Sequence, residues 1–301
     1  MQEPTPISLR RRSDLTIWPW IKLRMAAGIL AELSTAVDLW NLEHPFIATP
    51  CVSPDRLKVE LRVTRVETPP ILQWSANLGN AIGSLRAAAD SIAWQIAHLG
   101  GNQPQNPGKV CFPTAQDDQA WERQIKNLGQ IHPDLKLRFS ELRSTRGGEW
   151  LTLISSLAKL NNLDKHRSWL DIRPFFESGE LDNLIIKLDP SNNGSRAEIE
   201  LNDSLGEIHV GAVVARLRFS KPIDCAEGRV YGAVGPVLSN DLLGDVELDG
   251  SALNWVAAMH GALLYAFEHL CYGRSENSGF TPMEEDPETG NSIMDFENKS
   301  G

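Results

Sequence analysis

The sequence has few cysteines, no pair of closely spaced cysteines of the kind that binds zinc, and no long hydrophobic run. Its four cysteines (Cys51, Cys111, Cys225 and Cys271) lie far apart and form no CxxC pair. This spacing argues against a disulfide framework or a zinc site. No apolar stretch reaches the ~18–20 residues that a membrane-spanning helix needs. We therefore expect reduced thiols in a cytoplasmic protein, with no metal ion and no membrane partner.

The sequence also lacks the signatures of several enzyme classes. It has no HExxH pair, no P-loop, no GxSxG nucleophile turn and no dinucleotide-binding glycine pattern. Basic charge is scarce as well, since 29 lysines and arginines stand against 39 aspartates and glutamates, for a net charge of −10. A chain of this charge is not a general DNA binder. These absences predict no cofactor.

Length and composition indicate one folded domain between two polar ends. The chain has 301 residues, of which 42% are hydrophobic, and this is enough for a core. We expect a flexible arm over residues 1–14, a single domain over 15–273 and a disordered acidic tail over 274–301. The tail holds seven acids and two bases, so it carries half of the net charge.

Apolar residues spaced three and four apart predict four helices. Their expected ranges are about 20–43, 71–98, 149–165 and 251–272, the first directly after Trp18-Pro19. Gly100-Gly101 would end the second helix. Within that helix, Gly79 and Gly83 would let a neighbouring helix come close.

Alternating apolar and polar residues predict strands over about 57–66 and in the region 184–248. In the first strand, Leu57, Val59, Leu61 and Val63 alternate with charged residues. Helices on both sides of a mid-chain β region indicate an α+β domain. The simplest packing is a four-helix bundle with inserted antiparallel β-strands.

The densest polar segment runs from Asn161 to Arg167, at the expected end of the third helix. It places Asp164, Lys165 and His166 directly before Arg167. Cations at a helix C-terminus are favoured by the helix dipole, which supports a structural role. The same side chains could instead bind phosphate or transfer a proton. Because Asp164 continues the apolar row of its helix, we expect a buried carboxylate that needs a partner.

Arg86 and Asp90 lie four residues apart on the second predicted helix. They form either a modest surface ion pair or part of a crevice in which Arg86 pairs with Asp90 or Asp164. A guanidinium held there could bind phosphate through two hydrogen bonds. Residues 136–173 also hold eight basic and four acidic side chains, so this island is an anion or RNA contact or a solvated face.

Three segments taken together resemble an uncharacterised bacterial protein family with a helical LRxxLDHxAW motif, an FP step and a downstream DKHR. They are LGNAIGSLRAAADSIAW at 78–94, CFP at 111–113 and LAKLNNLDKHR at 157–167. The helical portion is similar in turn to HEPN domains, which are four-helix bundles of toxin–antitoxin and phage-defence systems. Many of these are metal-independent ribonucleases with an Arg-x4-6-His motif across a dimer interface.

The resemblance implies site residues, with one departure from the motif. Arg86 matches the motif arginine and Asp90 the polar residue beside the histidine, but the histidine position holds Ser91. His98 lies 12 residues beyond Arg86, about 18 Å along a helix, so it does not replace that histidine simply. The resemblance makes Arg86 and His166 the candidate catalytic residues. The ligand-binding or structural cluster around them would be Asp90, Asn161, Asp164, Lys165 and Arg167.

Two functions are therefore open. In the first, the protein has a HEPN-like helical core that binds RNA or a phosphate-bearing ligand. In the second, it is a non-catalytic homodimeric interaction or scaffold protein whose Arg/Asp/His cluster is structural. Ser91 in place of the motif histidine favours the second function, and the sequence leaves open whether the protein is an enzyme.

Overall fold

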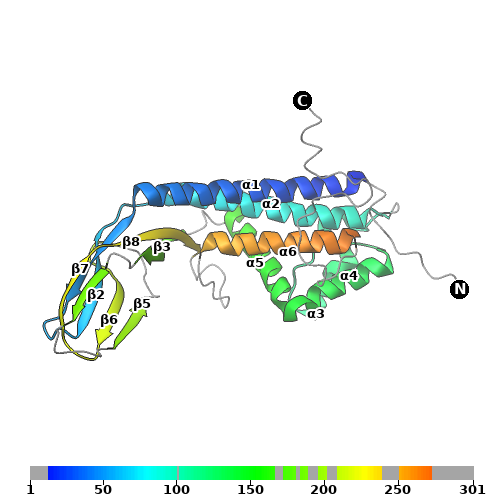
Figure 1. Ribbon diagram of the computed structural model, residues 1–301. Coiled ribbons are helices and arrows are strands. Elements are labelled where there is room, and N and C mark those ends of the chain that lie inside the picture. The colour runs from blue at the N-terminus through cyan, green and yellow to red at the C-terminus, as the bar shows by residue number, and fades with distance from the viewer. Residues whose placement is uncertain are drawn as a thin grey trace, which may run out of the picture.

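The computed structural model describes residues 13–99, 102–166, 172–180, 184–188, 196–201, 209–238 and 251–272. Within these ranges the chain forms an α+β fold, with the long helices side by side and the strands gathered at one end of them (Figure 1). The predicted α+β class is confirmed. Most of the expected arm and the whole expected acidic tail lie outside the described residues.

The described chain contains six α-helices and two short 3-10 helices. The four predicted helices are present and end close to the expected residues, but α1 begins at Ser13, so Pro19 lies inside the helix rather than before it. Two further helices between residues 118 and 144 were not predicted. The elements are α1 (Ser13–Glu43), α2 (Ile71–Ala97), η3 (Pro107–Lys109), α3 (Asp118–Asn127), α4 (Pro133–Ser144), η4 (Thr145–Gly148), α5 (Glu149–His166) and α6 (Ala252–Tyr272).

Helix α2 lies at the centre of the helical part and packs against α1, α5 and α6. Its buried row includes Leu78, Ile82 and Leu85, as the 3–4 spacing of apolar residues predicts. The expected close approach of a neighbouring helix occurs at Gly79, where a Cβ atom would lie 2.7 Å from Oδ1 of Asp164 on α5. At Gly83 a Cβ atom would have no neighbour within 4 Å, so this glycine faces open space.

The strands form one six-stranded and one two-stranded antiparallel sheet. The larger sheet has the order β3-β8-β1-β2-β6-β5, and the smaller one pairs β4 with β7. The strand prediction over 57–66 is confirmed by β2, while β1 and β3 were missed. The bounds are β1 (Phe46–Val52), β2 (Lys58–Arg65), β3 (Ile172–Glu180), β4 (Leu184–Leu188), β5 (Ala197–Leu201), β6 (Val213–Phe219), β7 (Ile223–Gly228) and β8 (Val230–Leu238).

Two separate insertions between helices build the larger sheet. The hairpin β1–β2 connects α1 to α2, and the strands β3 to β8 connect α5 to α6. Both insertions leave the helices at the same end (Figure 1). They join where β1 pairs with β8, with Ala48 opposite Val230, and where β2 pairs with β6, with Leu61 opposite Ala215. The predicted inserted antiparallel strands thus form a larger sheet drawn from both insertions, and β4 and β7 form a second, smaller sheet.

Each part has its own hydrophobic core. The core of the helical part includes Leu78 and Leu85, and the core of the strand part includes Val59, Leu61 and Ile223. On β2 the apolar residues face the second core, whereas Lys58, Glu60 and Arg62 lie on the opposite face, as alternation along a strand requires.

The last turns of α1 connect the two cores. Trp40 packs against both of them and meets the buried Trp74 of α2 edge to face at 5.9 Å between ring centroids. The neighbouring Asn41 side chain donates to the Val234 carbonyl at 3.0 Å and accepts from its N–H at 2.9 Å. Since β1 pairs with β8 only as far as Gly232, the Asn41 amide takes the place of a strand residue beside β8.

Candidate functional site

The sequence candidates Arg86 and Asp90 form a closed ion pair on α2. Arg86 donates from Nε to Oδ2 of Asp90 at 3.0 Å, and its Nη2 lies 2.8 Å from Oδ1. The guanidinium is therefore held by both carboxylate oxygens, the geometry that Arg prefers. The Arg86 side chain is 14% exposed, so it is mostly withdrawn from solvent. Of the two partners that the sequence proposed for Arg86, the structure supplies Asp90.

Asp90 also holds the CFP segment against the helix. Its Oδ1 accepts a hydrogen bond from the backbone N–H of Phe112 at 3.0 Å. The Phe112 ring is fully buried and meets Phe139 of α4 and Trp150 of α5. One carboxylate thus fixes the segment that carries an aromatic anchor into the helical core, and two of the three resemblance segments meet here.

Cys111 lies beside the same guanidinium. Burial raises the pKa of the Cys111 thiol, and the nearby Arg86 opposes that rise without cancelling it. The thiol is therefore protonated at neutral pH and is a poor nucleophile, because the thiolate is the reactive form. The groups around Arg86 are thus the Asp90 carboxylate, which is bonded to Arg86 and to the Phe112 N–H, and the protonated Cys111 thiol. They do not form an open reactive centre.

The residue at the motif histidine position, Ser91, is also engaged in a hydrogen bond. The Ser91 hydroxyl donates to the Ala87 carbonyl one turn earlier, at 2.7 Å. His98, at the end of α2, packs its ring at a tilt against Trp94, with 4.1 Å between ring centroids, and places its Nδ1 2.8 Å from the Trp94 carbonyl. The structure therefore brings neither Ser91 nor His98 to the Arg86 guanidinium.

The described part of the DKHR segment, Asp164 to His166, forms the end of α5. Asn161 is buried, but Asp164 is exposed, so the expected burial of this carboxylate is wrong. The apolar row of α5 leaves the core in its last turn, where Asp164 lies over Gly79 of α2. Gly79 precedes Arg86 by seven residues, about 10 Å along the helix. Lys165 and His166 are the last two residues of α5, their side chains lie outside the described ones, and Arg167 lies outside the described residues altogether.

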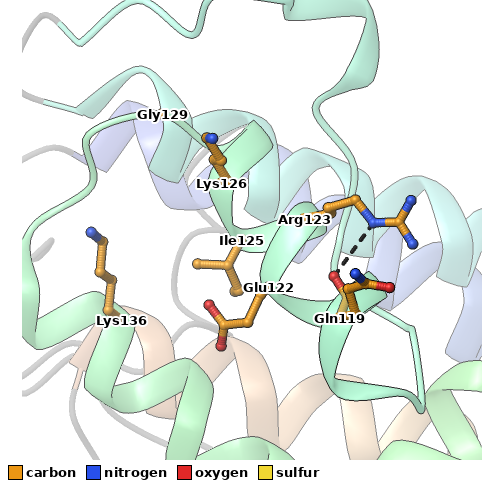
Figure 2. Close-up of a pocket in the computed structure, with 7 residues that line it drawn as sticks. All are labelled: Gln119, Glu122, Arg123, Ile125, Lys126, Gly129 and Lys136. Atoms are coloured by element: carbon orange, nitrogen blue, oxygen red, sulfur yellow. Dashed lines mark hydrogen bonds between the residues drawn. The ribbon is translucent and has the colours of Figure 1, made fainter.

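A pocket that the sequence did not predict lies between α3 and α4. It has a volume of about 470 Å³ and three basic side chains in its lining, Arg123, Lys126 and Lys136. Of these only Lys136 belongs to the basic island that composition indicated. Figure 2 shows Arg123 directed away from Lys136 and bonded through Nε to the Gln119 carbonyl at 3.4 Å. The cations line the pocket without converging on one point.

Other kinds of site receive no support from the described residues. Within them, no group of three or more His, Cys, Asp or Glu side chains is arranged to hold a metal ion. Among the helices that the structure describes, none combines the length and apolar character needed to cross a membrane. In comparisons with protein-family models, curated proteins and solved structures, none matches the chain.

Proposed function

We propose that this protein is a non-catalytic interaction protein, and that its Arg86–Asp90 pair is structural. The observation that carries the proposal is the double use of Asp90, whose carboxylate holds both Arg86 and the Phe112 N–H. A catalytic or phosphate-binding arginine would need to leave this carboxylate. Its departure would leave the carboxylate that anchors the CFP segment, through the Phe112 N–H, without its cation.

The local chemistry supports the same proposal. General acid–base catalysis needs a proton-transfer group within hydrogen-bond reach of the reacting atom. Beside Arg86 the described groups are a bonded carboxylate and a protonated thiol, and Ser91 is bonded within its own helix. The proposal keeps a distant HEPN-like relationship of the helical part, supported by the long packed helices, while assigning that part to binding rather than to RNA cleavage.

A nuclease assay with stability controls tests the proposal. Wild type, Arg86→Ala and His166→Ala are incubated with mixed-sequence single-stranded RNA at low salt, and cleavage and gel shift are followed. We expect no cleavage by any of them. Arg86→Ala should lower the melting temperature, whereas Arg65→Ala, which removes an exposed arginine of β2, should not. RNA cleavage by wild type that both site variants abolish would overturn the proposal.

A further inference from the structure

Helix α1 carries a row of exposed residues on the side that faces away from the core. The row includes Trp18, Ile21, Met25, Leu39 and Leu42, whose exposed fractions lie between 38% and 78%. Together with Gly28, Glu32 and Thr35, these residues are spaced alternately three and four residues apart over about 36 Å of helix. We call this row the outer seam of α1, and it comprises Trp18, Ile21, Met25, Gly28, Glu32, Thr35, Leu39 and Leu42.

The outer seam is unusual because α1 already buries its opposite face. Leu23, Leu33 and Val37 belong to the helical core, so both ends of the helix carry apolar residues on the opposite side as well. A surface helix with one apolar stripe is normally polar on its other side. The seam has apolar residues at both ends and Gly28, Glu32 and Thr35 between them, and its 3–4 spacing is the pattern by which one helix packs along another.

We propose that the outer seam binds the outer seam of a second copy of this chain, with the two α1 helices antiparallel. The inference rests on the proposed function, since it names the partner of an interaction protein. A two-fold axis opposite residue 30 makes the interface self-complementary, so that residue i contacts j and j contacts i. The seam then pairs Trp18 with Leu42, Ile21 with Leu39, Met25 with Thr35 and Gly28 with Glu32 of the other copy.

This register leaves every seam residue with a partner. A shift by one heptad would set Ile21 against Glu32 and leave Leu39 and Leu42 without a partner. The polar member Thr35 fits an apolar contact, because its hydroxyl donates to the Ala31 carbonyl at 2.9 Å and leaves the methyl group outward. Gly28 has open space where a Cβ atom would lie, which gives the side chain of Glu32 from the other copy room to turn toward solvent.

The charges along α1 favour an antiparallel partner. Lys22 and Arg24 flank the N-terminal half of the seam, whereas Glu32, Asp38 and Glu43 lie in or beside the C-terminal half. Antiparallel helices bring the basic half of each copy against the acidic half of the other, and parallel helices would oppose like charges. Among the described residues, no salt bridge within the chain occupies Lys22, Asp38 or Glu43, whereas Arg24 already has an interaction within its own chain, to which a contact with Asp38 of the other copy would be added.

The same charges argue against a lipid surface as the occupant. A basic amphipathic helix binds anionic bilayers through both its apolar face and its cations. Here the acidic C-terminal half, with Asp38 and Glu43 beside Leu39 and Leu42, would be repelled by anionic headgroups. A second copy satisfies both halves of the seam.

Light scattering after gel filtration measures the predicted assembly. We expect wild type to have twice the 33.3 kDa mass of one chain. Met25→Glu should raise the dissociation constant by about a hundredfold, as loss of a central apolar contact does. Because Met25 is exposed in the single chain, the Met25→Glu variant should have the melting temperature of wild type at concentrations where both are monomeric. Ser34→Glu, an exposed position of α1 outside the seam, should dimerise as wild type does.

Two further experiments test the orientation. Arg24→Glu and Asp38→Arg should each weaken the dimer, and the double variant should restore it, because the two positions face each other across antiparallel helices. After mixing, Met25→Cys and Thr35→Cys should form a disulfide between chains, with wild type as the control for the native cysteines. Cross-linking of Met25→Cys to itself would indicate parallel helices and overturn the proposal.

The outcomes separate this inference from the proposed function. A monomeric wild type, or a dimer that Met25→Glu leaves intact, overturns the inference, as does monomeric binding of wild type to phosphatidylserine vesicles. A protein that dimerises through the seam and also cleaves RNA in an Arg86-dependent manner retains the inference and loses the proposed function.

Discussion

Charged side chains have different surroundings in the helical part and in the sheet. In the helical part, Asp90 closes a network with Arg86 and the Phe112 backbone that ties a loop to the core. On the sheet, Glu60 lies among Lys58, Arg62 and Arg216 on the face away from the second core. The first network holds separate segments together, whereas the second pairs neighbouring strands that the backbone already connects.

This difference predicts unequal costs of substitution. Removing Asp90 leaves the Arg86 guanidinium, which is mostly withdrawn from solvent, and the Phe112 N–H without their acceptor. Removing Glu60 leaves Lys58, Arg62 and Arg216, whose side chains are 33% to 46% exposed, so water can solvate them in its place, and such ion pairs contribute little. Changes in the helical part and at its junction with the sheet should therefore destabilise the protein more than changes on the charged face of the sheet.

The largest effect should come from the junction that couples the two parts. Trp40→Ala removes a ring that packs against both cores and against Trp74, at a cost of about 3 kcal/mol of unfolding free energy. Denaturant unfolding followed by circular dichroism should show a lower midpoint, with the strands lost before the helices. Trp94→Ala, which removes an exposed ring, is the matched control. Equal effects of the two variants would contradict a coupling role of Trp40.

The Asp90 network should give the next largest effect. Asp90→Ala leaves both Arg86 and the Phe112 N–H without their acceptor and should cost about 2 kcal/mol. Asp90→Asn keeps an oxygen that can accept from Phe112, so its loss should be smaller. Thermal melting of the two variants measures the difference. If Asn and Ala melted alike, the backbone hydrogen bond would contribute nothing.

Asn41 should contribute less than Asp90. Asn41→Ala removes two hydrogen bonds to the backbone of Val234 and should cost about 1 kcal/mol. Asn41→Asp can accept from the Val234 N–H but has no donor for its carbonyl, so this variant should also be destabilised. Hydrogen exchange at the Val234 amide gives a local readout. Unchanged protection of that amide in Asn41→Ala would show that β8 does not depend on this side chain.

The smallest effect should come from Glu60 on the sheet. A hydrogen bond from Lys58, aided by Arg62, lowers the pKa of Glu60 below its ordinary 4.5. Because the folded pKa is the lower one, the stabilisation is present at neutral pH and is lost as the pH falls through that lowered value. Glu60→Gln should cost less than about 1 kcal/mol at neutral pH and low salt. The difference from wild type, measured by denaturant unfolding, should vanish in acid and shrink at high salt, and a pH-independent difference would contradict this account.

The strongly periodic elements were predictable from the sequence. The buried row of α2 and the alternation along β2 are local patterns, and both were predicted within about two residues at each end. Strand β1 was missed because its Pro50 suggests an interruption. In the sheet, β8 pairs with only the first three residues of β1, so Pro50 lies where one side of the strand is unpaired and a missing N–H is tolerated.

The site was predictable only in part, because its contacts join segments far apart in the chain. The pairing of Arg86 with Asp90 follows from their spacing of four residues. The hydrogen bond between Asp90 and Phe112 crosses 22 residues and leaves no periodic signal. The burial of Asp164 was predicted wrongly. The apolar row of α5 shows on which side of the helix Asp164 lies, but it does not show that α5 leaves the helical core in its last turn.

The pairing of β1 with β8 also determines the order in which the protein can fold. Ala48 of β1 lies opposite Val230 of β8, so β1 is synthesised about 180 residues before β8. At ~5–20 residues per second this interval is on the order of ten to forty seconds. During most of that time the hairpin lacks both of its neighbours in the sheet, β8 and β6, and the helical core lacks α6. Both cores are therefore completed by the same late stretch of chain, from Val230 to Tyr272.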